Sequence, residues 1–170
     1  PEEWIGPNNV AYVHLMKGET DKAIGILKEL KEKYPNNKSI VNNLGVCFRR
    51  TKKYDKAFES YDKAKSLGAK EANNVAIVNI HVAKYDAAVN GFESSRCDYN
   101  KALAYCLKKD YDNAKKTIEC IETKSADDFY LRAIVGARTD DLDLMGTSLT
   151  RAVKLDASIR DRAKKDNEFR

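Results

Sequence analysis

Apolar residues recur along most of the chain at steps of three and four, the spacing that forms one face of an α-helix. Val10, Ala11 and Leu15 make up one such set, and Leu27 and Leu30 belong to the next. Short polar turns separate the sets, and the paired pattern returns several times along the chain. The chain is therefore expected to consist of helical hairpins that repeat.

The second helix of each predicted hairpin contains a small or apolar residue at a constant place, which we call the anchor residue. The anchors are Ala23, Ala57, Ala88, Ala114 and Met145. An aspartate precedes each of them, namely Asp21, Asp55, Asp86, Asp112 and Asp143. A carboxylate in the first turn of a helix is favoured by the free backbone N–H groups and by the positive end of the helix dipole. Helix initiation thus explains the repeated aspartate without a role in catalysis.

The anchors divide the chain into predicted repeats, whose boundaries fall between hairpins. We expect repeat 1 at 7–37, repeat 2 at 38–70, repeat 3 at 71–96, repeat 4 at 97–124 and repeat 5 at 125–156. The intervals between anchors shorten after repeat 2, so repeats 3 and 4 should be shortened in the second helix or its exit loop. Residues 1–6 are expected to be an N-terminal remnant or cap. Residues 157–170 are expected to form a capping helix, because an array needs a polar outer surface at its end.

Two of the repeats carry the pattern of a known family. Repeat 2 has Leu44-Gly45, Phe48, Tyr54, Ala57, Tyr61 and Ala64, and repeat 1 has Gly18, Ala23, Leu27, Leu30 and Pro35-Asn36-Asn37. These residues resemble the tetratricopeptide repeat, and the resemblance covers about residues 7–156. It implies an all-α, right-handed α-solenoid of about five helix-turn-helix hairpins with a C-terminal capping helix. Met145 departs from the alanine that is usual at the anchor, and only repeat 1 ends with proline.

Composition excludes several other classes of protein. The formal net charge is +5, from 31 basic and 26 acidic residues. The signs are interspersed, as on a solvated helical surface, whereas a nucleic-acid binder more often shows a stripe of one sign. No apolar run is long enough to cross a membrane. The two histidines lie in separate repeats and no glycine-rich phosphate loop occurs, so we expect no enzyme, no cofactor and no small-molecule substrate.

The four cysteines, Cys47, Cys97, Cys106 and Cys120, include no CxxC pair. We expect most of them to be small buried hydrophobic residues rather than members of a bridge or a metal site. A metal held by Cys97, Cys106, Cys120 and His81 is disfavoured by the irregular spacing of these residues. The chain begins at Pro1 without a methionine, like a fragment, so its compartment is left open.

One polar residue recurs in the first helices, at a constant distance before the anchor. It is Asn9, Asn43, Asn74 or Asn100 in the first four repeats, and Leu131 stands there in the fifth. Family resemblance implies that the first helices line a concave surface. Asparagine amides there would suit the main chain of an extended peptide, since each offers an acceptor and two donors. The alternative is that asparagine is tolerated near helix starts and is common in this repeat.

Other residues of the first helices are candidates for partner binding. Tyr12 would either contact a ligand side chain or pack against the neighbouring hairpin. Arg50, Lys70 and His81 would favour a ligand that bears carboxylates, although the helix dipole alone also selects basic residues at helix C-termini. A known variant of the family clamps the terminal carboxylate of a chaperone peptide. The matching positions hold Asn8, Tyr12, Asn43, Lys70 and Asn74; only Asn43 and Lys70 fit, so we expect that clamp to be absent.

The sequence therefore predicts a non-catalytic scaffold that binds a protein or peptide segment in the concave groove. Two alternatives remain. The array could be a structural spacer or oligomerisation module within a larger protein, joined through its convex face or its N-terminal end. Less favoured is a solenoid that binds nucleic acid through tyrosines and lysines along its helices, for which binding would weaken sharply with salt.

Overall fold

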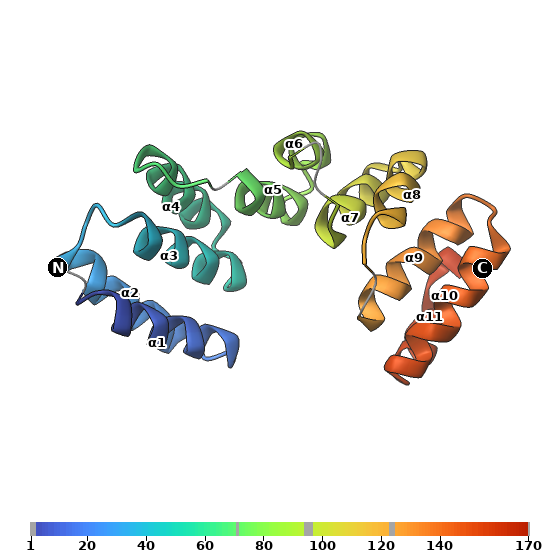
Figure 1. Cartoon of the computed structure of the whole chain (residues 1–170), viewed down its shortest axis with the longest axis horizontal. Coiled ribbons are helices and arrows are strands. Elements are labelled where there is room, and N and C mark those ends of the chain that lie inside the picture. Colours follow the sequence, from blue (N-terminus) through green and yellow to red (C-terminus); the bar gives the residue numbers. More distant parts are fainter. Residues whose placement is uncertain (1–2, 71, 94–96, 123–124, 170) are drawn as a thin grey trace. The chain divides into compact units, whose positions relative to one another are not determined.

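The computed structural model describes residues 3–70, 72–93, 97–122 and 125–169. Over these residues the chain forms eleven α-helices and one short 3-10 helix, and it contains no strand (Figure 1). The chain divides into two compact units, Pro1–Lys84 and Tyr85–Arg170. We call them unit 1 and unit 2 and describe each by itself.

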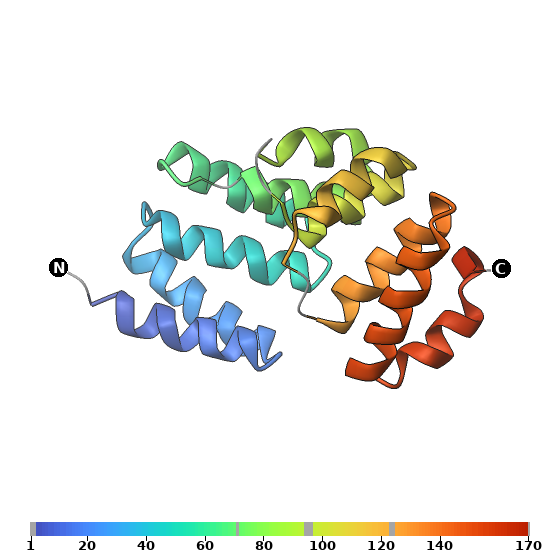
Figure 2. The same cartoon turned by 45° about the vertical axis from the view of Figure 1, so that its right-hand side comes forward.

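Unit 1 contains the first five helices. They are α1 (Ile5–Met16), α2 (Thr20–Lys33), α3 (Lys38–Arg50), α4 (Tyr54–Ser66) and α5 (Ala72–His81). The pairs α1 with α2 and α3 with α4 pack as helical hairpins, as Figure 2 shows. These hairpins coincide with predicted repeats 1 and 2, and α5 is the first helix of predicted repeat 3.

Unit 2 contains the remaining helices. They are α6 (Tyr85–Gly91), α7 (Tyr99–Lys108), α8 (Tyr111–Glu119), α9 (Ala126–Arg138), α10 (Leu142–Leu155), α11 (Ile159–Lys165) and the 3-10 helix η1 (Asn167–Phe169). The pairs α7 with α8 and α9 with α10 pack as hairpins. The segment predicted as a capping helix forms α11 and η1. The boundary between the units falls inside predicted repeat 3, between its first helix and its second.

The N-terminal helix begins earlier than the sequence pattern indicates. Helix α1 starts at Ile5, so Ile5 and Gly6 belong to repeat 1 rather than to an N-terminal remnant. Pro7 lies in the first turn of α1, where a backbone N–H is not needed for helical hydrogen bonding. Trp4 packs against the buried core that includes Ala11 and Leu15, and this contact seals the first hairpin.

The second helices begin as predicted. The five repeated aspartates each lie in the first turn of their helix, in α2, α4, α6, α8 and α10. The four anchor alanines are completely buried, and Met145 is half-buried. The interpretation of these residues as helix-initiating and packing positions is thus confirmed.

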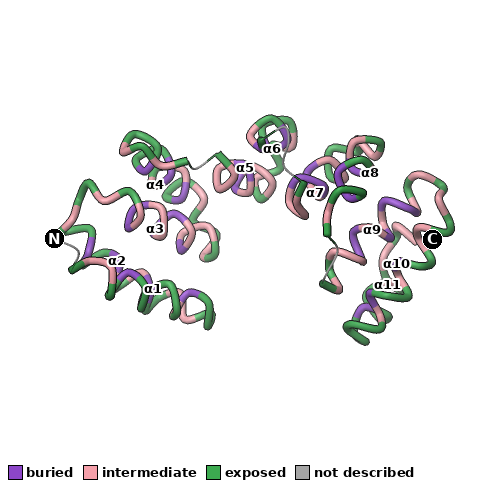
Figure 3. The backbone as a smooth tube through the Cα atoms, in the orientation of Figure 1, coloured by how far each residue is buried: buried purple, intermediate pink, exposed green. Residues whose placement is uncertain are grey.

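Figure 3 colours the backbone by burial and shows buried residues in the helices of both units. In unit 1, Leu15, Leu27, Ile40 and Leu44 form one cluster, and Tyr61 packs with Val78 in another. Gly45 provides the room for Tyr61, because a Cβ at this glycine would lie 2.5 Å from the Tyr61 ring. In unit 2 the clusters are Ile118 with Leu131 and Val135, and Tyr130 with Ala152 and Ile159.

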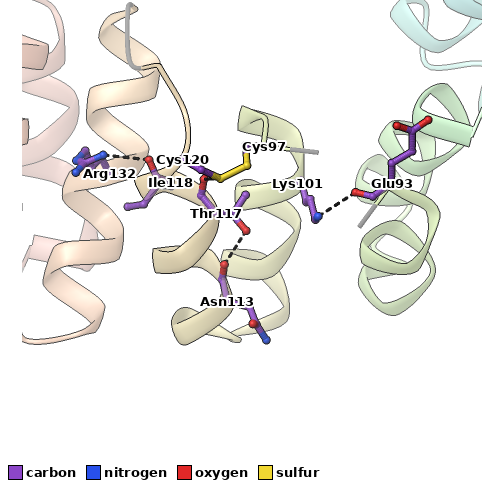
Figure 4. The surroundings of a disulfide bond; sticks show 8 residues. All are labelled: Glu93, Cys97, Lys101, Asn113, Thr117, Ile118, Cys120 and Arg132. Carbon is purple, nitrogen blue, oxygen red and sulfur yellow. Dashed lines mark hydrogen bonds between the residues drawn. A yellow bond between two sulfur atoms is a disulfide. The ribbon is translucent and has the colours of Figure 1, made fainter. Parts of the chain in front are cut away.

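The cysteines differ from the sequence-based expectation. Cys97 and Cys120 form a disulfide (Figure 4), and both residues are exposed. The bridge joins Cys97, two residues before α7 begins, to Cys120, the C-cap of α8, so it closes this hairpin at its open end. The prediction of a small buried hydrophobic residue is therefore wrong for Cys97 and Cys120. It is right for Cys47, which is completely buried, while Cys106 is half-buried.

Candidate functional site

The first helices of unit 1 are linked side by side by pairs of asparagines. The Asn43 amide Nδ2 donates to Asn8 Oδ1 at 3.0 Å, which joins α3 to α1. One repeat further on, Asn74 Nδ2 donates to Asn42 Oδ1 at 3.0 Å, which joins α5 to α3. Each bond pairs the second asparagine of one Asn-Asn dipeptide with the first asparagine of the dipeptide before it. Neither pair was predicted from the sequence.

The hydrogen bonds between asparagines of neighbouring helices leave some donors and acceptors of each side-chain amide available for another partner. An asparagine side chain has two N–H donors and an oxygen with two lone pairs, and the bond to Asn8 uses one donor of Asn43. Asn8 itself is buried, whereas Asn43 is half-buried and reaches the surface. Asn43 is thus held in a fixed orientation by Asn8 while its amide remains accessible from one side.

Beside Asn43 lies a surface pocket with a volume of about 500 Å³. Its lining, which we call the Asn-Lys pocket, consists of Lys38, Ser39, Asn42, Asn43, Gly68, Ala69 and Lys70. Both lysines are exposed, and the lining contains no carboxylate. The Lys38 ammonium donates to the backbone carbonyl of Gly68 at 3.4 Å. The pocket therefore combines two positive charges with two amides and a hydroxyl.

Local sequence explains why these groups meet. Asn37 is the N-cap of α3, and its side chain accepts hydrogen bonds from the backbone N–H groups of Ser39 and Ile40. This cap fixes the start of α3 at Lys38, so the first turns of the helix carry the pocket's polar residues. After α4, Gly68 adopts a φ of +84°, which side-chain-bearing residues rarely adopt. The turn there places the loop to Lys70 against the start of α3.

The other predicted residues of unit 1 lie outside this pocket. Asn9 and Tyr12 are exposed on α1, and Tyr12 is 52% exposed. Arg50 donates from Nη1 to the backbone carbonyl of Leu15 at 2.6 Å. Arg50 therefore satisfies a carbonyl near the C-terminal end of α1, a structural role that the sequence analysis did not consider.

His81 is exposed at the end of α5, where its ring stacks on Tyr54 with centroids 5.6 Å apart. The ring is nevertheless partly desolvated, and this desolvation, with smaller contributions from Arg49 and Lys52, lowers the pKa of His81 below its ordinary value. The imidazole is consequently neutral at neutral pH. A neutral ring does not supply the positive charge for which His81 was proposed as a ligand contact.

Asn100, the fourth asparagine of the predicted series, lies half-buried on α7 in unit 2. Among the pockets formed by the described residues, one is lined by two of the predicted binding residues, Asn43 and Lys70. Lys38, Ser39 and Asn42 also line it, and the sequence analysis did not assign them. The repeated Asn-Asn dipeptide could have indicated Asn42 as a pocket residue. Lys38 and Ser39 could not be identified in this way, because they line the pocket only through the position of the loop between α4 and α5.

Within the described ranges, no group of three or more His, Cys, Asp or Glu side chains lies close enough together to hold a metal ion. Across the same part of the chain, each helix is too short or too polar to cross a membrane.

Family models place two segments of the sequence among known repeats. Residues 9–37 and residues 39–68 each match a tetratricopeptide repeat model. A comparison with curated protein sequences gave no match.

Solved structures resemble the chain over nearly its whole length. MamA from Desulfovibrio magneticus RS-1, from residue 41 to the end, is 17% identical with a TM-score of 0.70, covering 93% of this chain and 97% of that one. A thermophilic TPR protein of Thermus thermophilus is 14% identical with a TM-score of 0.70, covering 94% and 96%. YrrB, described as a TPR protein with an unusual peptide-binding site, is 16% identical with a TM-score of 0.64, covering 97% and 93%. At these identities the likeness concerns the fold, which is an all-α solenoid.

Proposed function

Because this chain is a tetratricopeptide repeat protein, and therefore a scaffold for protein–protein interaction, we propose that it binds an extended peptide segment of a partner protein. The peptide lies along α1, α3 and α5 of unit 1, and binding involves no catalysis. A relative of the same fold, YrrB, is described as having a peptide-binding site, which supports this class of ligand.

The Asn-Lys pocket is the observation that carries the proposal. Lys38 and Lys70 supply two ammonium groups, and the N-terminal end of α3 adds the positive end of a helix dipole. The lining has no carboxylate to neutralise these charges. A carboxylate of the ligand, from an acidic side chain or a chain end, fits this arrangement, because charge-assisted hydrogen bonds are the stronger ones.

Asn43 would contact the ligand main chain next to that carboxylate. Its amide is oriented by Asn8 and keeps both donor and acceptor capacity. An amide of this kind can pair with a peptide N–H and C=O regardless of the ligand side chain, while the lysines select for negative charge. The exposed ring of Tyr12 on α1 offers apolar contact further along the same helices.

The lysines give the first test. The probes are unstructured octapeptides, each with a single Asp or Glu, and the set moves this residue through all eight positions. Fluorescence anisotropy measures their binding to the chain. A parallel set carries Lys in place of each acidic residue. We expect the acidic peptides to bind, and Lys38→Glu combined with Lys70→Glu to weaken them at least about tenfold by removing both cations and adding repulsion.

The matched control is Lys28→Glu combined with Lys31→Glu, which makes the same charge change at exposed positions of α2. Control binding should stay within about twofold of the wild type. Equal weakening in both double variants would show that only net charge matters, and the pocket would then have no specific role.

The asparagine pair gives a second test, because Asn43→Ala and Asn8→Ala remove the same hydrogen bond between α1 and α3. Both substitutions should lower the free energy of unfolding by about 1 kcal/mol, since each leaves a polar partner unpaired. Only Asn43 lines the pocket. Asn43→Ala is therefore expected to weaken the best acidic octapeptide more than Asn8→Ala does, measured by anisotropy beside urea denaturation. Equal losses of affinity would assign the asparagines a structural role alone.

A further inference from the structure

Unit 2 contains a second groove, independent of the Asn-Lys pocket, between α10 and the C-terminal segment. Its volume is about 730 Å³. Leu149 and Val153 of α10, Ala163 of α11 and Phe169 of η1 form an apolar floor, and all four are half-buried. The remaining lining residues are Gly146, Thr150, Lys154, Arg160 and Lys164. We call this surface the α10–α11 groove.

One wall of the groove is held firmly by contacts on its far side. The Tyr130 hydroxyl of α9 donates to Asp166 at 2.6 Å, and the Arg162 guanidinium lies 4.2 Å from the Tyr130 ring centroid. Arg138 pairs with Glu168 in the same segment. Ile159, at the start of α11, is buried. Because these contacts fix α11 and η1 against α9, the groove exists before any partner binds.

The charges at the groove are of one sign. Lys154, Arg160 and Lys164 are exposed among the lining residues, and no carboxylate lines the groove. Lys164 has a distant partner in Asp161, with an N–O separation of 3.9 Å. In the described part of the chain, no ion pair involves Lys154 or Arg160. Two further acids of the same segment, Asp166 and Glu168, are engaged with α9.

Space above the floor is open in the second turn of α10. A Cβ placed on Gly146 would meet no heavy atom within 4 Å. Glycine inside a helix costs stability relative to alanine, and here it leaves the backbone of α10 accessible. A helix of a partner could therefore approach closely along the direction of α10.

We propose that the α10–α11 groove docks an acidic amphipathic helix of a partner protein. The apolar stripe of that helix would cover the floor, and its Glu or Asp residues would pair with the three cations at the rim. A second copy of this chain does not fit this description at its exposed apolar helix. Helix α1 exposes Val10, Val13 and Met16, but its first turn has no acidic residue and its last turn carries His14.

The test uses a synthetic helical probe of about 15 residues, with Leu at helical spacing on one face and Glu on the flanks. A second probe replaces each Glu with Lys. Fluorescence anisotropy on the full chain should show binding of the Glu probe and at least about tenfold weaker binding of the Lys probe. Lys154→Glu combined with Arg160→Glu should weaken the Glu probe and restore the Lys probe.

A steric variant separates the groove from charge alone. Gly146→Leu fills the open space and should weaken the Glu probe at least about tenfold. Gly25→Leu is the control, because Gly25 lies inside α2 and also has open space at its Cβ position. Circular dichroism verifies that both variants fold.

Several results would overturn the proposal. They are no binding of the Glu probe, equal binding of both probes, or unchanged binding in Gly146→Leu. Light scattering tests whether a second copy of this chain occupies the groove instead. Self-association that Gly146→Leu abolishes would identify a second copy as the occupant. Because the octapeptide test of unit 1 uses other residues, this proposal and the proposed function can fail separately.

Discussion

Removing the Cys97–Cys120 disulfide is expected to lower the free energy of unfolding of unit 2 by about 3 kcal/mol. The bridge spans a sequence separation of 23 and holds the start of α7 against the end of α8. Without it, the unfolded chain gains the freedom of an open loop, which favours unfolding. Helices α7 and α8 are short, with 10 and 9 residues, and have limited packing surface to compensate.

Urea denaturation of the full chain, with and without dithiothreitol, measures this effect. Cys97→Ser combined with Cys120→Ser is the control, which should match the reduced wild type and not respond to the reductant. In the folded chain the free cysteines are poor nucleophiles, because burial raises the pKa of Cys47 to about 11 and that of Cys106 to about 12. Unfolding exposes them, so the oxidised samples are denatured at mildly acidic pH, where thiol exchange is slow. Identical unfolding of the oxidised and reduced chains would contradict the prediction.

Gly136→Ala is expected to lower the free energy of unfolding by about 2 to 3 kcal/mol. An added Cβ would lie 2.6 Å from the backbone nitrogen of Met145 and 3.0 Å from the carbonyl oxygen of Asp141. Both atoms belong to the backbone at the start of α10. Relief therefore requires α9 and α10 to separate, since no flexible side chain can move aside.

Gly146→Ala is the matched control on α10. Open space at its Cβ position predicts no clash, and alanine should stabilise the helix by up to about 1 kcal/mol. Urea denaturation of the two variants should thus give shifts of opposite sign. A Gly136→Ala variant as stable as the wild type would show that α9 and α10 adjust freely.

The sequence pattern predicted the hairpins well because each depends on local spacing. Periodic apolar residues define a helix face, and an aspartate before a small residue marks the next helix start. Gly136 was a missed signal. It precedes Met145 by the same interval as His14 precedes Ala23 and Phe48 precedes Ala57. Glycine at a position occupied by larger side chains in other repeats indicated a close approach of two helices.

The candidate site was less predictable, because it depends on how neighbouring helices are offset. Repeat spacing identified Asn43 and Asn74 but could not show that Asn8 and Asn42 accept their hydrogen bonds. The Cys97–Cys120 pairing was also beyond the sequence, since spacing alone does not determine connectivity. In the Asn-Lys pocket, Lys38 meets Lys70 through a loop geometry that no periodic pattern describes.

The proposed function depends on a peptide carboxylate that binds at the start of α3 in unit 1. Backbone amide NMR spectra of the labelled chain, titrated with the tightest acidic octapeptide, test it most directly. We expect chemical-shift changes to concentrate at Lys38, Ser39, Asn43 and the loop from Gly68 to Lys70. Lys38→Glu combined with Lys70→Glu should abolish these changes. Changes confined to other faces of unit 1, or to unit 2, would contradict the account.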